Sequence, residues 1–143
     1  MTVPMWMLLG FAVWTVMLLI ATVGVYRWSR ILTGRVAIRN FRGDHIDGED
    51  WYRRAMRAHA NCVENLPVFS AIVLALYVSG IRSPVVDNVS VVVLAARIIQ
   101  SIIHVSFVES NLMVSLRFTF FSVQLAGFLC LVFIIVRQAA LTG

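Results

Sequence analysis

The sequence has little charge. Charged residues make up 13% of its 143 residues, and lysine is absent, so all twelve basic residues are arginines. A soluble domain carries about a quarter charged residues. Hydrophobic residues make up 60% of the chain, and its mean hydropathy is +0.87. These values exclude an ordinary soluble domain and indicate a membrane protein, and the chain is short enough to be a single domain, residues 1–143.

Cysteine is also scarce. Cys62 and Cys130 belong to no CxxC pair and lie within or beside apolar stretches, so we expect two buried free thiols and no metal site. The net charge is +5, but most arginines lie between or just inside apolar runs. Nucleic-acid-binding proteins carry their basic residues on a solvated face, so this distribution indicates membrane topology and no nucleic-acid partner.

Four apolar segments are each long enough to cross a bilayer, and the first, residues 1–26, contains no charged residue. Asp47 or Asp50 is placed to cap the second helix. The short connections after the second and third segments predict antiparallel neighbours. The sequence therefore predicts an all-α, up-down bundle of four transmembrane helices, near residues 3–27, 50–81, 84–109 and 112–138.

The arginines also predict the orientation in the membrane. Eight of them flank the first connection: Arg27, Arg30, Arg35, Arg39, Arg42, Arg53, Arg54 and Arg57. Positive charge favours the cytoplasmic side. We therefore expect the first and third connections in the cytoplasm, and both termini and the Arg82 turn on the opposite side.

Polar side chains inside the second and third segments share faces. A helix advances about 100° per residue, so five residues of the second segment fall within an arc of about 100°. Gln100 lies three residues after Arg97 and four before His104, so these residues form one narrow stripe. So many polar groups exceed the needs of one structural ion pair, and they predict a polar pocket for an anionic ligand. The residues of the second segment are Arg54, Arg57, Asn61, Glu64 and Asn65.

Glu64 and Arg97 lie at matching depths. Glu64 is fourteen residues from Asp50, and Arg97 is twelve residues from Glu109. At 1.5 Å per residue both depths are about 18–21 Å. Antiparallel neighbours can therefore bring the two charges together, directly or through a ligand.

The stretch RAMRAHANCVENLPVF, residues 54–69, resembles the signature of the MAPEG family, the membrane-associated proteins of eicosanoid and glutathione metabolism. The Ala96–Arg97 pair and Arg117 at the opening of the fourth segment also resemble the family, and so do the length and the four segments. Within the family the chain resembles a bacterial-type member similar to microsomal glutathione transferase. Asn65 and His104 stand where some members of the family have tyrosine.

This resemblance implies a homotrimeric four-helix bundle that binds glutathione between subunits. Arg57, Asn61 and Glu64 match residues that hold glutathione, and Arg97 matches an arginine near the site. Arg117 resembles the arginine that stabilises the glutathione thiolate, and a nearby guanidinium lowers the pKa of a thiol. The expected ligand-binding set is Arg54, Arg57, Asn61, Glu64, Asn65, Arg97, Gln100 and His104, with Arg117 catalytic.

Three functions compete. The first is a membrane-bound, glutathione-dependent transferase or peroxidase that acts on lipophilic electrophiles arriving through the bilayer. The second is a non-catalytic, MAPEG-like protein that binds lipid or acts as a scaffold. The third is a small four-helix multidrug transporter, which would need a carboxylate in the first segment, and residues 1–26 contain none.

Overall fold

The structure is a computed structural model that describes residues 1–35, 37–38, 41 and 48–142. In this part of the chain the regular elements are all helical, which confirms the predicted fold class. α1, η1 and α2 form one continuous helical stretch, and it is one of four stretches long and apolar enough to span a membrane. The elements are α1 (Val3–Leu18), η1 (Leu19–Gly24), α2 (Val25–Leu32), α3 (Asp50–Val78), α4 (Pro84–Ser106) and α5 (Asn111–Thr142).

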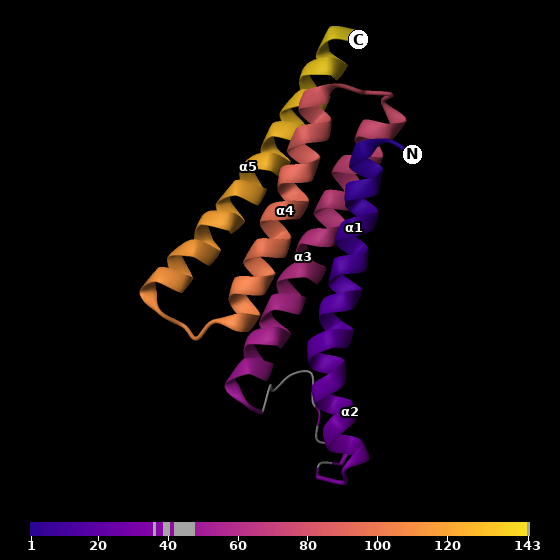
Figure 1. Cartoon of the computed structure of the whole chain (residues 1–143). Coiled ribbons are helices and arrows are strands. Elements are labelled where there is room, and N and C mark those ends of the chain that lie inside the picture. The colour runs from indigo at the N-terminus through magenta and orange to yellow at the C-terminus, as the bar shows by residue number, and fades with distance from the viewer. Residues whose placement is uncertain (36, 39–40, 42–47, 143) are drawn as a thin grey trace.

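The helices run alternately up and down (Figure 1). Both termini lie at one end of the bundle, together with the turn between α3 and α4. The connection between α4 and α5 and the start of α3 lie at the other end. α5 diverges from the other helices toward its own N-terminus, so the bundle is widest at the end that carries the α4–α5 connection.

The first span is longer than predicted, because α2 ends at Leu32 and not near residue 27. The end of this span packs against the start of α3. Tyr26 stacks on Tyr52 with 4.1 Å between ring centroids, and Arg27 Nε donates a hydrogen bond of 2.8 Å to the Tyr52 hydroxyl. Ahead of α2, η1 is a π-helical segment, in which Thr22 Oγ1 donates to the carbonyl of Leu18 at 2.5 Å. The contacts of Tyr26 and Arg27 with Tyr52 hold the first span beside α3 at the arginine-rich end of the bundle.

Two predicted helix ends are also too long. α3 ends at Val78 because Gly80 adopts a left-handed φ of 65°, which glycine takes without steric cost. The amides of Gly80 and Ile81 then bond back to the carbonyls of Tyr77 and Leu76, which closes the helix. α4 ends at Ser106 because Phe107 is extended, with φ −113° and ψ 143°.

The start of α3 differs from the predicted cap. Glu49 is the N-cap residue, and its side chain makes no capping bond, while Asp50 is the first helical residue. Asp47 lies outside the described residues. At the other end of the bundle Ser83 is the N-cap of α4, where its hydroxyl accepts a bond from the Val86 amide at 3.3 Å.

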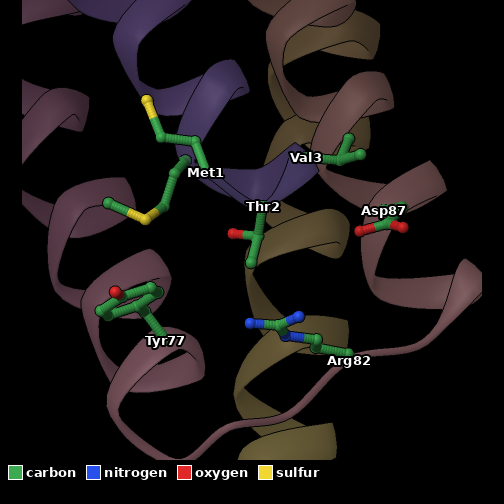
Figure 2. A pocket seen from close by; sticks show the side chains of 7 residues that line it. Met1, Thr2, Val3, Tyr77, Arg82 and Asp87 are labelled. Carbon is green, nitrogen blue, oxygen red and sulfur yellow. The ribbon is translucent and has the colours of Figure 1, made fainter.

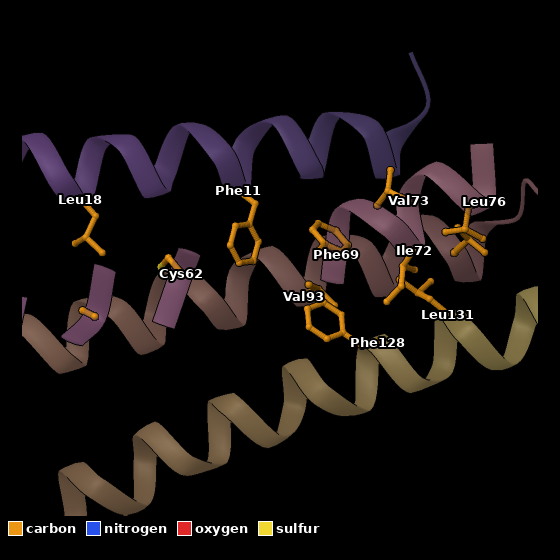
Figure 3. Packing of buried hydrophobic residues seen from close by; sticks show 12 residues of the cluster. Phe11, Leu18, Cys62, Phe69, Ile72, Val73, Leu76, Val93, Phe128 and Leu131 are labelled. Atoms are coloured by element: carbon orange, nitrogen blue, oxygen red, sulfur yellow. The ribbon is translucent and has the colours of Figure 1, made fainter. Parts of the chain in front are cut away.

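The core is aromatic at its centre (Figure 3). Phe69 of α3 lies between Phe11 of α1 and Phe128 of α5, with 5.8 Å between ring centroids on each side. Cys62 is fully buried in the same cluster, so its predicted burial as a free thiol is confirmed. Cys130 is also free but is partly exposed, so its predicted burial is wrong. The core therefore joins all four spans at mid-height.

Gly127 lets α5 approach α4 closely. A Cβ at this position would lie 2.6 Å from Val93 Cγ2, closer than packed atoms come. We expect Gly127→Ala to destabilise the bundle by about 1–3 kcal/mol through overpacking. Thermal unfolding in detergent measures this, with Ala126→Val on the exposed face of α5 as the control. Equal melting temperatures for the two variants would contradict the close approach.

Candidate functional site

The polar stripe of α3 lies on the outside of the bundle. Arg57 and Glu64 are exposed, and Asn61 and Asn65 are partly exposed. The opposite side of the helix carries Cys62 and the other apolar residues that face the core. Asn65 Nδ2 donates to the carbonyl of Asn61 at 2.7 Å, so that amide is bonded within its own helix. Arg57 and Glu64 face outward, whereas Arg54 is half-buried and its Nε is enclosed.

The polar stripe of α4 is buried instead. Arg97, Gln100 and His104 are only 1%, 6% and 8% exposed. Arg97 Nε and Nη2, Gln100 Oε1 and His104 Nε2 have no hydrogen-bond partner among the described residues. Buried polar atoms are bonded in most proteins, so a group of unbonded ones indicates space for water or a ligand. This stripe therefore brings free hydrogen-bonding capacity into the bundle.

Helices α3, α4 and α5 together form one hollow of about 290 Å³. Gly127 faces Val93 in the antiparallel pair α4 and α5, so Arg117, ten residues before Gly127, lies level with the turn that carries His104. The hollow thus contains four of the predicted residues, with three apolar side chains from α5 beside them. Its lining residues are Asn61, Gln100, His104, Val114, Arg117, Phe118 and Phe121.

A second hollow of about 320 Å³ adjoins the arginine-rich end of α3. It is lined by Asp50, Arg53, Arg54, Arg57, Val108 and Glu109. Glu109 connects the two hollows, because its Oε1 lies 3.6 Å from Arg57 Nη2 and 3.7 Å from Arg117 Nη1.

Arg97 and Glu64 lie at similar depths but are not joined. Cys62 Sγ lies 3.4 Å from Ser101 Oγ, which fixes the antiparallel register of α3 and α4 and places Glu64 near the level of Arg97. The Glu64 carboxylate lies on the outer surface, whereas Arg97 is buried. The guanidinium carbon of Arg97 lies 5.7 Å from the centre of the Phe11 ring. Within one chain, Arg97 therefore faces the core and Glu64 faces outward.

Sequence reasoning missed two residues of this region. Gln124 is 1% exposed, and neither polar atom of its side chain has a partner among the described residues. It lies one turn from Phe128, so it brings a buried amide to the centre of the bundle. Its signal in the sequence is a lone amide within an apolar run. Glu109 enters the sequence argument only as the end of the third segment, and nothing local in the sequence shows that it reaches both Arg57 and Arg117.

Another hollow, of about 450 Å³, lies at the opposite end of the bundle (Figure 2). Arg82, Asp87 and Tyr77 border it together with the first residues of the chain. It contains none of the polar residues of the α3 and α4 stripes. We place the candidate site at the arginine-rich end, because cationic groups from three helices and unbonded buried polar atoms converge only there in the part of the chain that the structure describes.

Comparison with protein families matches the MAPEG family to residues 3–137. The chain belongs to the MAPEG family. The predicted resemblance is thereby confirmed, and with its four spanning helices this MAPEG protein is an integral, multi-pass membrane protein. No significant match was found among curated proteins or among solved structures.

Proposed function

We propose that this MAPEG protein is a membrane-bound, glutathione-dependent transferase or peroxidase that acts on lipophilic electrophiles. The observation that carries the proposal is the convergence of Asn61, Gln100, His104 and Arg117 on one hollow, with Arg57 linked to it through Glu109. Membership of a family of glutathione and eicosanoid metabolism supports the choice of thiol.

The charges of the region suit glutathione. At neutral pH glutathione carries two carboxylates and one ammonium. Arg54 and Arg57 are available to the carboxylates as strong, charge-assisted donors, and Glu64 is available to the ammonium. Glu64 is the one acidic residue between positions 51 and 80, so it is the natural cation-binding group of α3. A ligand of this pattern finds an opposite charge for each of its own in a low-dielectric setting.

In this proposal the chain supplies no nucleophile of its own, and the sulfur of glutathione attacks the electrophile. Arg117, with a side chain 16% exposed, would hold the thiolate form through its guanidinium. Phe118 and Phe121 line the same hollow and would receive the apolar substrate beside the sulfur. Because Phe118 on the rim of this hollow is 69% exposed, an electrophile dissolved in the bilayer would enter from the side.

The outward polar stripe supports a homotrimer. Glu64 lies fourteen residues after Asp50, the first residue of α3, and its side chain is exposed. At that depth in the membrane, contact of a carboxylate with lipid is costly. A neighbouring copy of the chain would cover Glu64 and Asn61 and complete the hollow. We expect native mass measurement in mild detergent to give three copies of the chain. A stable monomer or dimer that keeps full glutathione binding would contradict this assembly.

The alternative is a non-catalytic MAPEG protein that binds lipid. It is favoured by a mostly apolar groove of about 240 Å³ between α1, η1 and α4, lined by residues such as Trp14, Leu18, Ile102 and Val105. Turnover decides between the two functions. The transferase consumes thiol and electrophile together, whereas the lipid-binding protein leaves both unchanged at every thiol concentration.

A further inference from the structure

We infer that Glu109 is an internal counter-ion that occupies the position of the ligand's anionic groups. It must move away when the ligand binds, and it therefore sets the affinity and the anion selectivity of the site. This inference rests on the proposed function for the identity of the natural ligand. The mutual geometry of Glu109, Arg57 and Arg117 carries it.

A single carboxylate oxygen serves both arginines. Glu109 Oε1 lies 3.6 Å from Arg57 Nη2 on α3 and 3.7 Å from Arg117 Nη1 on α5. Charge-assisted hydrogen bonds between such groups measure about 2.7–2.9 Å. The carboxylate therefore lies between the two guanidinium groups without a close bond to either. An anion that bonded each arginine directly would interact more strongly than Glu109 does.

Glu109 also sits where it can move at low cost. It belongs to the non-helical connection between Ser106, the last residue of α4, and Asn111, the first of α5. Its side chain is 48% exposed, and Val108 beside it is 74% exposed. Displacement of the carboxylate into solvent therefore buries no unpaired charge and breaks no helix. The two arginines, in contrast, are anchored on regular helices.

The position of Glu109 has a consequence for selectivity. While Glu109 lies between Arg57 and Arg117, its negative charge offsets part of theirs. A neutral molecule therefore gains no electrostatic attraction from the two arginines. A single small anion must compete with a tethered carboxylate of high effective concentration. A ligand with several anionic groups and further contacts in the hollow displaces it. Glu109 thus lowers affinity for every anion and excludes the weakest ones.

The test compares Glu109→Gln with Glu49→Gln. Glu49 lies at the same end of the bundle but pairs with Arg30, so its change removes the same charge without touching the site. We expect Glu109→Gln to lower the Kd of glutathione, measured by calorimetry, about fivefold, the scale of one released ion pair. Glu49→Gln should leave the Kd unchanged. Glu109→Asp, which keeps the charge but shortens its reach, should fall between them.

A second arm needs no glutathione. Sulfate at low millimolar concentration, at constant ionic strength, should raise the melting temperature of Glu109→Gln, because an anion bound to the folded state stabilises it. Wild type and Glu49→Gln should respond less. If wild type fails to bind glutathione but the sulfate response holds, the proposed function fails and the counter-ion role stands. If glutathione binds wild type and Glu109→Gln alike, and sulfate shows no difference, the counter-ion role is overturned and the proposed function stands.

Discussion

Arg117→Ala is expected to lower the kcat of glutathione conjugation about 100-fold, the loss typical when one preorganised charge-stabilising group is removed. Arg117 lines the hollow with Gln100 and His104, and its side chain is only 16% exposed. A guanidinium in that position favours the thiolate over the thiol. Without it, bound glutathione stays protonated at neutral pH and reacts slowly.

The effect should fall on kcat more than on KM, because Arg117 acts on the sulfur and not on the remote carboxylates. Steady-state kinetics with a lipophilic aryl halide, together with the ultraviolet absorbance of bound thiolate, measures both quantities. Arg137→Ala is the matched control, since Arg137 lies near the other end of the same helix. Equal kcat values for the two variants would remove Arg117 from the chemical step.

Glu64→Gln is expected to weaken glutathione binding about 10- to 100-fold, since a hydrogen bond to a charged group contributes about 1.5–3 kcal/mol. Glu64 would accept from the ammonium of glutathione, and glutamine keeps the shape while losing the charge. Conjugation should remain measurable at high thiol concentration, because the sulfur and Arg117 are untouched.

Equilibrium binding by calorimetry gives the Kd of each variant. Asp87→Asn is the control, because Asp87 lies in the first turn of α4, at the opposite end of the bundle. The same comparison separates a ligand-binding role from a structural one. If Glu64→Gln altered the melting temperature and the proposed trimer but not the Kd, Glu64 would be an assembly residue.

The spans were predictable because each apolar run exceeds the thickness of a bilayer, and this signal needs no tertiary information. Helix ends were less predictable. Gly80 stopped α3 three residues early, and Phe107 became extended inside what looked like a continuous apolar segment. In both places a local backbone conformation ended the helix where hydropathy alone gave no boundary.

The polar stripes were predictable as stripes but not in their direction. Helical periodicity shows that Arg57, Asn61 and Glu64 share a face, and that Arg97 and His104 share another. It does not show which face is buried. α4 has neighbours on several sides and buries its stripe, whereas α3 buries Ala55, Ala58 and Cys62 and exposes Arg57 and Glu64. The matched depth of Glu64 and Arg97 therefore did not produce an ion pair within one chain.

Contacts across connections were not predictable. Arg57 and Glu109 are 52 residues apart in sequence, and Arg117 belongs to a third element. Their contact depends on the direction that α5 takes after the α4–α5 connection, and no periodic pattern in the sequence predicts that direction. Gln124 shows a different limit, because one amide in an apolar helix is equally compatible with a lipid-facing and a core-facing position.

The most direct test of the central claim is a titration of the purified protein with glutathione at neutral pH, followed by thiolate absorbance in the ultraviolet. The account predicts a saturable rise in thiolate that is absent with S-methylglutathione and greatly reduced in Arg117→Ala. Wild-type protein that binds no glutathione, or binds it without forming thiolate, would contradict the account.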